Sequence, residues 1–272
     1  MTIPQLLQPV HDEFELFRQE YQRRTHSGVP LLDEVEDYLR QYPGKQLRPL
    51  LVLLAAKACN TFSTNHITIA TIVELLHNAT LMHDDVVDES ANRRGHDSVC
   101  HRWSNQVAVL CGDYYLAQVM ASLHQMDDDT VTDIINSTVC TMCEGELKQL
   151  ANSNRQLDEA CYIDIIGSKT ASLIATCCEL GAYTSDSSTP SPYRQALHDF
   201  GYHYGIVFQM RDDMYDIDTH HDATLLRDCD PLQLVDRHTR LAAEALQHLP
   251  DSPAKQSLLS LLLPSAPQPT NL

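Results

Sequence analysis

Two short segments of the sequence repeat the same arrangement of aspartates. Residues 83–89 read HDDVVDE and residues 211–217 read RDDMYDI, so each contains Asp-Asp-x-x-Asp. On a helix, residues four apart lie on one face, and like charges at that spacing repel. Mg²⁺ offsets this repulsion because it binds one or two carboxylates together with phosphate oxygens and water. The spacing therefore predicts a metal site at four aspartates: Asp84, Asp88, Asp212 and Asp216.

A single motif of this kind in a chain with 37 acidic residues could equally be a solvated helix face. Two copies, each at the end of a long apolar helix, favour the metal interpretation. His77 lies two turns before Asp84, and Gln209 begins an i, i+3, i+7 stripe through Asp212. A polar stripe on an apolar helix predicts an internal polar cleft, because buried carboxylates need partners. Taken in isolation, His77 could also be a core histidine with satisfied hydrogen bonds.

Cationic residues cluster near these motifs, although the chain has only five lysines. Lys45 and Arg48 lie in the segment GKQLRP, Arg93 and Arg94 precede a glycine, and Lys169 lies in Ser-Lys-Thr. Each group alone could be a solvated surface feature. Together they supply the donors that two diphosphates require.

The elements that must position these residues are helices. Apolar residues recur at three- and four-residue spacing, without strand-like alternation or an internal repeat. This pattern predicts an all-α bundle of about ten helices in one domain, residues 1–263, followed by a flexible tail, 264–272. The expected helices cover 5–25, 30–41, 47–59, 66–89, 106–125, 129–151, 158–182, 192–218, 230–248 and 253–263. Ser63 or Thr64 is expected to cap the fourth.

The composition excludes several classes of protein. The 272 residues are 43% hydrophobic, which suits a globular fold, and a net charge of −18 makes a nucleic-acid partner unlikely to bind. The nine cysteines form no regular framework and are expected to be thiols in a reducing compartment. We see no signal peptide and no apolar stretch long enough to span a bilayer. These features predict a soluble, cytoplasmic protein.

At this point the sequence resembles the trans-polyprenyl (isoprenyl) diphosphate synthases. The matching segments appear in family order and cover roughly residues 30 to 216. They are GKQLRP at 44–49, LLHNATLMHDDVVDESANRRG at 75–95, GDYYLAQ at 112–118, EGELKQL at 144–150, GSKTASL at 167–173 and FQMRDDMYD at 208–216.

The resemblance implies a helical bundle around a central cavity, of the isoprenoid synthase type, and assigns roles to residues. The residues expected to bind isopentenyl diphosphate are Lys45, Arg48, His77 and Arg94. Those expected to bind the allylic diphosphate are Arg93, Lys169, Thr170 and Gln209. Asp84, Asp88 and Asp212, with Lys169, would be the catalytic set. Asp216 would complete the set of Mg²⁺ ligands, while Asp85 and Asp213 would not bind the ion but would help to hold its ligands in place.

The implied reaction joins isopentenyl diphosphate to an allylic diphosphate in trans. Cationic groups and Mg²⁺ stabilise the departing diphosphate, and the resulting carbocation is attacked by the positioned double bond. The small residues Ala79 and Thr80, just before the first motif, resemble long-chain, octaprenyl-type members. The resemblance also implies a homodimer, with any membrane contact limited to the surface during product release.

The resemblance fails after Asp216. The family continues with a glycine-lysine phosphate site, whereas here no lysine occurs before Lys255, and Arg227 is the residue nearest the missing position. The simplest account is an internal shortening. It keeps a second interpretation open, a non-catalytic or regulatory subunit of a hetero-oligomeric prenyl diphosphate synthase. A third, a terpene cyclase, is disfavoured because the second motif is entirely aspartate.

Overall fold

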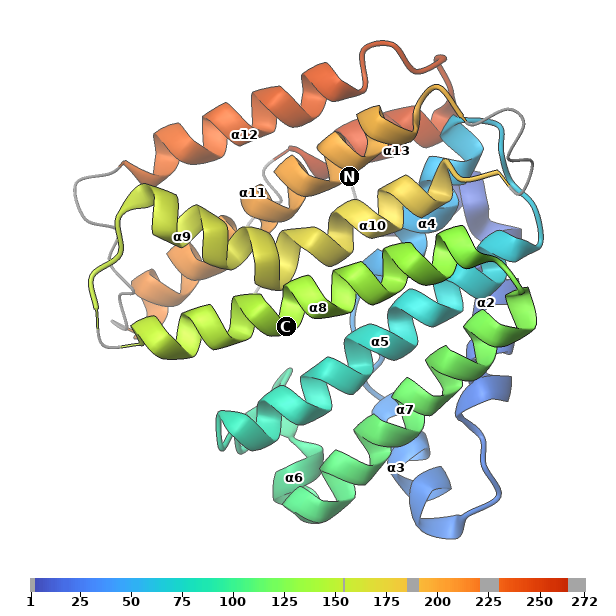
Figure 1. Ribbon diagram of the computed structural model, residues 1–272, viewed down its shortest axis with the longest axis vertical. Coiled ribbons are helices and arrows are strands. Elements are labelled where there is room, and N and C mark those ends of the chain that lie inside the picture. Colours follow the sequence, from blue (N-terminus) through green and yellow to red (C-terminus); the bar gives the residue numbers. More distant parts are fainter. Residues whose placement is uncertain (1–2, 154, 185–190, 221–229, 264–272) are drawn as a thin grey trace. The chain divides into compact units, whose positions relative to one another are not determined.

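The structure is a computed structural model that describes residues 3–153, 155–184, 191–220 and 230–263, apart from the side chains of Ile3 and residues 216–220. Helices make up almost all of its regular structure (Figure 1). The first half contains α1 (Ile3–Leu7), η1 (Gln8–Val10), α2 (His11–Thr25), α3 (Pro30–Arg40), α4 (Leu47–Ala58), α5 (Asn65–Val87), α6 (Val99–Arg102) and α7 (Asn105–Met126). The second contains α8 (Asp129–Asn152), α9 (Glu159–Ile166), η2 (Gly167–Ala171), α10 (Ser172–Gly181), α11 (Arg194–His220), α12 (Pro231–Ala245) and α13 (Pro253–Leu261). The all-α prediction is confirmed.

Helix ends carry the local signals expected of them. The Ser104 side chain accepts a hydrogen bond from the amide of Val107 and so caps α7. Asp127, in the left-handed conformation with φ 53°, ends the same helix. Side chains also cap α6, α9, α12 and α13, from Ser98, Asp158, Asp230 and Ser252 respectively. Short-range sequence signals therefore decide where these helices begin and end.

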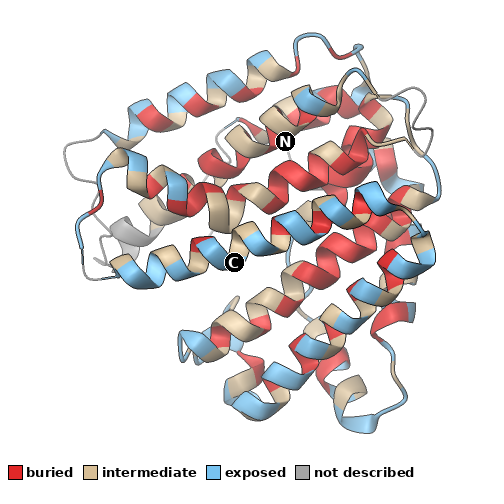
Figure 2. Cartoon of the chain, viewed as in Figure 1, coloured by how far each residue is buried: buried red, intermediate tan, exposed pale blue. Residues whose placement is uncertain are grey.

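Contacts group the described residues into two compact units. Unit 1 comprises Met1–Leu53 and Ser63–Asp128, and unit 2 comprises Leu54–Phe62 together with the described part of Asp129–Pro264. The first aspartate motif belongs to unit 1 and the second to unit 2. Each unit has its own buried side chains around the helix that carries its motif (Figure 2).

Helix α5 is the central element of unit 1. It packs against α7 and α2, which lie beside it in Figure 1. Its first half is almost wholly buried: from His66 to Leu76 the side chains of Ile69, Ile72 and Leu75 are at most 1% exposed. Burial decreases toward the aspartates, where Val87 and Asp88 are exposed. The packed half of α5 therefore fixes the position of its acidic end.

In unit 2, α11 packs against α10, η2 and α12. A buried cluster joins α9, η2, α11 and α12, and it includes Leu157, Tyr162, Ile165, Ile166, Ala171, Ile206, Met210 and Leu234. Two glycines allow the backbones to approach closely. A Cβ on Gly201 would lie 2.7 Å from the Cα of Ala175, and one on Gly205 would lie 2.6 Å from the Cα of Ala171. Any side chain at these positions would force α11 away from α10 and η2.

The structure differs from the sequence-based expectations in four local features. The expected helix 158–182 is interrupted by the π-helical segment η2, and the expected helix 5–25 is divided by the 3-10 turn η1. Two strands of two residues, β1 (Asn92–Arg93) and β2 (His96–Asp97), form an antiparallel pair where no strand was expected. Thr64 precedes α5, but no side chain caps that helix. Short irregular elements of this kind leave no periodic signal in the sequence.

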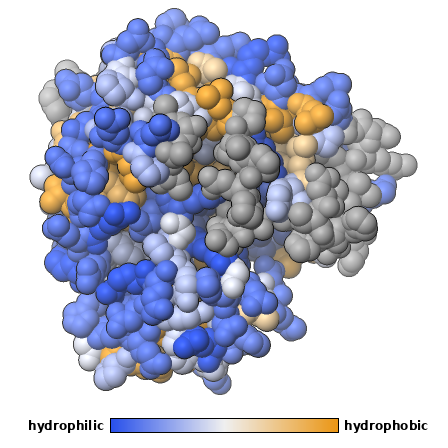
Figure 3. Space-filling view, turned by 180° about the vertical axis from the view of Figure 1, so that it is seen from behind, coloured by the Kyte–Doolittle hydropathy of each residue, from blue (hydrophilic) through white to orange (hydrophobic). Residues whose placement is uncertain are grey.

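The surface is largely polar. The face seen in Figure 3 is mostly hydrophilic, with apolar residues in small groups. Among the described helices, none is long and apolar enough to cross a membrane. The proposed tail, 264–272, lies outside the described residues.

Candidate active site

The acidic end of α5 presents two of the predicted metal ligands one turn apart. Asp84 is half-buried and Asp88, the C-terminal cap, is exposed. The amide of Asp88 still donates to the carbonyl of Asp84, at 2.8 Å, so the helical geometry holds through both residues. The two carboxylates therefore lie on one face of the helix, as the spacing predicted.

Asp85 faces the protein instead. It is 4% exposed, and the guanidinium of Arg93 donates to its Oδ1, with Nε at 2.9 Å and Nη2 in closer contact. Burial raises the pKa of Asp85, and the positive charge of Arg93 acts against this rise. This agrees with the expectation that Asp85 supports the motif from behind. Arg93, expected to bind the allylic diphosphate, is held against the first motif in this structure.

A tight hairpin places Arg94. The turn between β1 and β2 has positive φ at both central residues, 54° at Arg94 and 77° at Gly95, which is typical of a type I′ turn. Glycine adopts this conformation freely, whereas a left-handed arginine costs about 1–2 kcal/mol. The arginine extends to Gly44, where a Cβ would lie 2.4 Å from its guanidinium carbon. A Cβ at position 44 would displace the end of the Arg94 side chain, and the positive φ of 64° also favours glycine there.

Arg48 and His77 are hydrogen-bonded to each other. The Arg48 Nη1 lies 2.9 Å from the His77 Nε2. A guanidinium has donors only, so Nε2 must accept, which places the proton of a neutral His77 on Nδ1. Burial lowers the pKa of His77 well below its usual value, and Arg48 and Arg94 lower it further. His77 is therefore a neutral imidazole in a cationic environment, unlike a histidine packed in an apolar core.

Aromatic contacts hold the loop that carries Lys45. The ring of Tyr42 stacks on His96 with centroids 3.5 Å apart, and the hydroxyl of Tyr38 donates to the carbonyl of Asp97 at 2.8 Å. These contacts join the end of α3 to the hairpin. Lys45 itself is exposed. Unit 1 thus brings Arg48, His77 and Arg94 together, with Lys45 on the loop next to them in sequence.

In unit 2, Thr170 and Gln209 form part of a hydrogen-bonded chain. The Thr170 hydroxyl donates to Gln209 Oε1 at 2.9 Å, and Gln209 Nε2 donates to Asp213 Oδ1 at 2.8 Å. The hydroxyl of Tyr162 donates to the other oxygen, Oδ2, at 2.5 Å. Burial and the negative charge of Asp213 both raise the pKa of Tyr162, which keeps its proton on the hydroxyl. Asp213 therefore faces protein donors, as expected of a supporting residue.

Lys169 lies on the π-helical segment η2, beside Thr170. Its Nζ is 2.6 Å from Glu146 Oε2, and both side chains are about a quarter exposed. The wider π turn fits closely against α8, since a Cβ on Gly145 would lie 2.6 Å from the amide nitrogen of Lys169. Single π turns inside α-helices occur frequently at functional sites. The turn sets where Lys169 and Thr170 project from an otherwise regular helix.

The remaining predicted ligands lie on α11. Asp212 is half-buried, one turn beyond Gln209. The side chain of Asp216 and the whole of Arg227 lie outside the described residues. Within the described part of the chain, no three His, Cys, Asp or Glu side chains gather closely enough to enclose a metal ion.

Residues 29–249 match the family model of polyprenyl synthetase. The chain belongs to this family. An all-trans-nonaprenyl-diphosphate synthase of Rhodobacter capsulatus is 36% identical over 213 residues, which are 78% of this chain and 65% of that protein. Octaprenyl diphosphate synthase of Haemophilus influenzae is 33% identical over 217 residues, 79% of this chain and 65% of that protein. The chain spans slightly less than two thirds of the length of these curated relatives.

Solved structures share the fold of this polyprenyl synthetase family member over nearly its whole length. A decaprenyl diphosphate synthase from Rhodobacter capsulatus superposes with a TM-score of 0.84 at 28% identity, covering 96% of this chain and 97% of that one. A geranylgeranyl pyrophosphate synthase from Corynebacterium glutamicum, complexed with calcium and isoprenyl diphosphate, gives 0.76 at 26% identity, covering 95% and 96%. These matches confirm the isoprenoid synthase type of fold.

Sequence reasoning missed three residues that contact the predicted site. Glu146 pairs with Lys169, Tyr162 donates to Asp213, and the buried Glu74 lies one turn before His77 on α5. Glu146 stands within the segment EGELKQL and Glu74 immediately before LLHNATLMHDD, so their places in the matching motifs were a usable signal. Tyr162 lies in no such motif, and only the structure shows its role.

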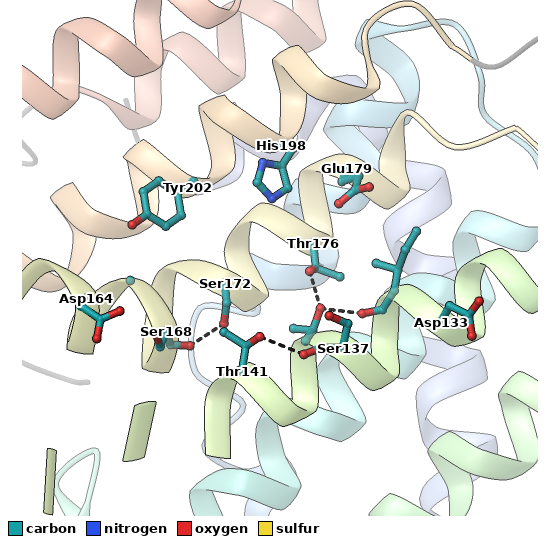
Figure 4. A pocket seen from close by; sticks show the side chains of 13 residues that line it. Asp133, Ser137, Thr141, Asp164, Ser168, Ser172, Thr176, Glu179, His198 and Tyr202 are labelled. Carbon is teal, nitrogen blue, oxygen red and sulfur yellow. Dashed lines mark hydrogen bonds between the residues drawn. The ribbon is translucent and has the colours of Figure 1, made fainter. Parts of the chain in front are cut away.

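Unit 2 contains a cavity of about 480 Å³, and Ser168, the residue before Lys169, is part of its lining (Figure 4). Hydroxyl groups dominate its lining: Thr138 and Thr176 are hydrogen-bonded at 2.7 Å, and Ser172 donates to the carbonyl of Ser168 at 2.6 Å. None of the predicted site residues lines it, and its lining includes no lysine or arginine. A cavity without cations does not suit a diphosphate, so we do not take it as the active site.

Proposed function

We propose that this chain is a prenyltransferase, a polyprenyl diphosphate synthase that condenses isopentenyl diphosphate with an allylic diphosphate in trans. The observation that carries the proposal is the composition of one face of α5. The C-terminal end of this helix bears Asp84 and Asp88 one turn apart. About two turns before Asp84, the side chain of His77 is hydrogen-bonded to Arg48. Carboxylates for a metal and cationic donors for a diphosphate thus occur on one packed helix, in a chain of the polyprenyl synthetase family.

The donor set fits Mg²⁺. Asp84, Asp88, Asp212 and Asp216 offer only carboxylate oxygens, the hard ligands that Mg²⁺ prefers in combination with waters and substrate phosphates. Calcium accompanies isoprenyl diphosphate in the solved Corynebacterium glutamicum enzyme. When bound, such an ion would neutralise charge on the departing diphosphate.

The residues of this chain would bind and orient the two substrates. Arg48, Arg94 and Lys45 would pair with the phosphates of isopentenyl diphosphate, and the Nδ1–H of His77 would donate to them. The phosphates of the allylic diphosphate would be bound by four residues: Arg93, Lys169, Thr170 and Gln209.

The reaction requires no protein nucleophile. The allylic C–O bond breaks with its electron pair leaving on diphosphate, the double bond of isopentenyl diphosphate forms the new C–C bond, and a proton is lost to the released diphosphate. Apolar walls would keep water from the carbocation.

We propose a medium or long polyprenyl product. Ala79 is small and fully buried, and Thr80, whose hydroxyl donates to the carbonyl of His77, is also small. The positions before the first motif therefore carry no bulky side chain. Relatives named octaprenyl and nonaprenyl synthases support the same conclusion. We further propose one functional domain over residues 1–263, a homodimer, and a cytoplasmic location. The free thiols of all eight cysteines among the described residues support a reducing compartment.

The second candidate is a non-catalytic or regulatory subunit. A Bacillus subtilis relative, 33% identical over 209 residues, is named component 2 of heptaprenyl diphosphate synthase, and this name supports assembly with a second kind of subunit. The shortening after Asp216 would suit a subunit that has lost part of one substrate site.

Incubation with isopentenyl diphosphate, farnesyl diphosphate and Mg²⁺, followed by chromatography of the lipid products, separates the candidates. Elongated prenyl chains would support the synthase, and cyclic hydrocarbons would support a cyclase. Activity that appears only after a partner is added would support the subunit. Asp84→Ala should abolish turnover with the fold intact. Asp12→Ala, which removes an exposed carboxylate from α2, is the matched control and should retain it. Turnover of Asp84→Ala at the wild-type rate would refute the assignment of the first motif.

A further inference from the structure

Helix α5 carries a buried glutamate that the proposed reaction leaves without a role. Glu74 is 3% exposed, one turn before His77, and its Oε2 has no hydrogen-bond partner among the described residues. An ionised carboxylate in such a place is costly unless cations lie near it. The surroundings of Glu74 therefore decide its charge.

Charged and titratable groups face Glu74 from three neighbouring elements. Arg48 of α4 and Arg94 of the hairpin act on it as cations. Tyr21 of α2 lies in the same electrostatic environment, and its hydroxyl accepts from Asn78, at 2.9 Å. Glu36 of α3 also acts on Tyr21. Burial raises the pKa of Glu74, while Arg48, Arg94 and, to a smaller extent, a hydrogen bond with the Asn78 side chain lower it.

The two cations that stabilise an ionised Glu74 are thus the same two that the proposed function assigns to isopentenyl diphosphate. A bound diphosphate brings several negative charges to Arg48 and Arg94. It competes with the buried carboxylate for the same positive field, and Glu74 itself cannot move into water from the packed half of α5. Binding of the diphosphate therefore favours the neutral, protonated form of Glu74.

We propose that Glu74 is a charge-balancing residue of the diphosphate site, which takes up one proton from solvent when isopentenyl diphosphate binds to Arg48 and Arg94. The inference rests on the proposed function and deepens it. The neighbouring groups are poor alternative proton acceptors. Guanidinium groups are already protonated, and a proton on His77 Nε2 would break its hydrogen bond with Arg48. The product of the step is a neutral carboxyl group beside an occupied anion site.

Titration calorimetry with isopentenyl diphosphate tests this directly. At pH 8.5 the ligand carries no titratable proton, so heats measured in two buffers of different ionisation enthalpy report protons taken up by the protein. We expect the wild type to take up protons on binding, at most one per ligand, and its dissociation constant to rise with pH by up to tenfold per unit. No net uptake by the wild type would overturn the inference.

Glu74→Gln keeps the shape of the side chain and removes its charge. It should bind with little proton uptake and a nearly flat pH dependence. Glu36→Gln is the matched control, because Glu36 is also buried and burial raises its pKa to about 7. The cation that acts on Glu36 is Arg40, and not Arg48 or Arg94. This control should keep the wild-type uptake. Equal uptake in wild type and Glu74→Gln would overturn the role of Glu74 alone, whereas absence of any binding by the wild type would overturn the proposed function.

Discussion

The hydroxyl of Tyr162 offers the sharpest test of how the second motif is supported. It is buried, and it donates to Asp213 at 2.5 Å, while Gln209 donates to the other carboxylate oxygen. Tyr162→Phe removes only the donor and keeps the ring that packs in the core. A hydrogen bond to a charged group contributes about 1.5–3 kcal/mol, so the free energy of unfolding should fall by that amount. At roughly 2–4 °C per kcal/mol, Tm should fall by about 3–12 °C.

Urea unfolding followed by circular dichroism measures this change. Tyr202→Phe is the matched control, because Tyr202 is half-buried on α11 and its hydroxyl makes no hydrogen bond within the described part of the chain. It should change stability by less than about 0.5 kcal/mol. A double-mutant cycle with Asp213→Asn isolates the pair, since a direct contact leaves a coupling energy that independent sites lack. Tyr162→Phe with wild-type stability, or a cycle without coupling, would refute the reasoning.

Three further changes test other parts of the structure. Gly205→Ala should destabilise the protein by about 1–3 kcal/mol, because the new Cβ would lie 2.6 Å from the backbone of Ala171. Urea unfolding measures this change, and an unchanged midpoint would contradict the close packing of α11. Gly44→Ala should raise the KM for isopentenyl diphosphate more than it lowers kcat, since its Cβ would displace the guanidinium of Arg94, whereas an effect on kcat alone would argue against this contact. Between pH 6.5 and 4 the free energy of unfolding of the wild type should fall by up to about 3 kcal/mol more than that of His238→Gln. Parallel curves of unfolding free energy against pH for the two proteins would contradict this prediction.

The sign of the last prediction follows from the histidine pair that joins α11 to α12. The Nδ1 atoms of His203 and His238 lie 3.0 Å apart, so one ring must donate and the other accept. Burial lowers the pKa of His238 to about 4, and burial also lowers the pKa of His203. In the unfolded chain a histidine titrates near 6.5, so the unfolded state binds more protons between these values. The stability that depends on a neutral His238 is therefore fully present above about pH 6.5 and is lost as the pH falls toward 4.

Much of the fold could be predicted because it follows from local patterns. The apolar periodicity of 65–87 and 105–126 fixes α5 and α7, and Ser104 marks the start of α7. The two aspartates on one face of α5 also follow from helix geometry alone. Expectations of this kind depend only on residues within one or two turns of each other.

The rest depends on contacts between residues distant in sequence. The role of Tyr162 requires α9 to meet α11, and the neutral state of His77 requires Arg48 to reach it from another helix. The hairpin at Arg94 and Gly95 was missed because two residues with positive φ give no periodic pattern. The π turn was missed for a related reason: one additional residue within a long helix does not interrupt its apolar character.

That additional residue has a consequence for how the chain tolerates change. A π turn holds one residue more than an α turn, so a regular helix would absorb a deletion of one residue between 167 and 171 and keep the later residues on their present faces. Cys177, Cys178 and Leu180 would stay buried. The loss would fall on the turn itself, because Lys169 and Thr170 would leave the positions from which they reach Glu146 and Gln209. The additional residue therefore serves the placement of these two side chains and not the packing of the helix that follows.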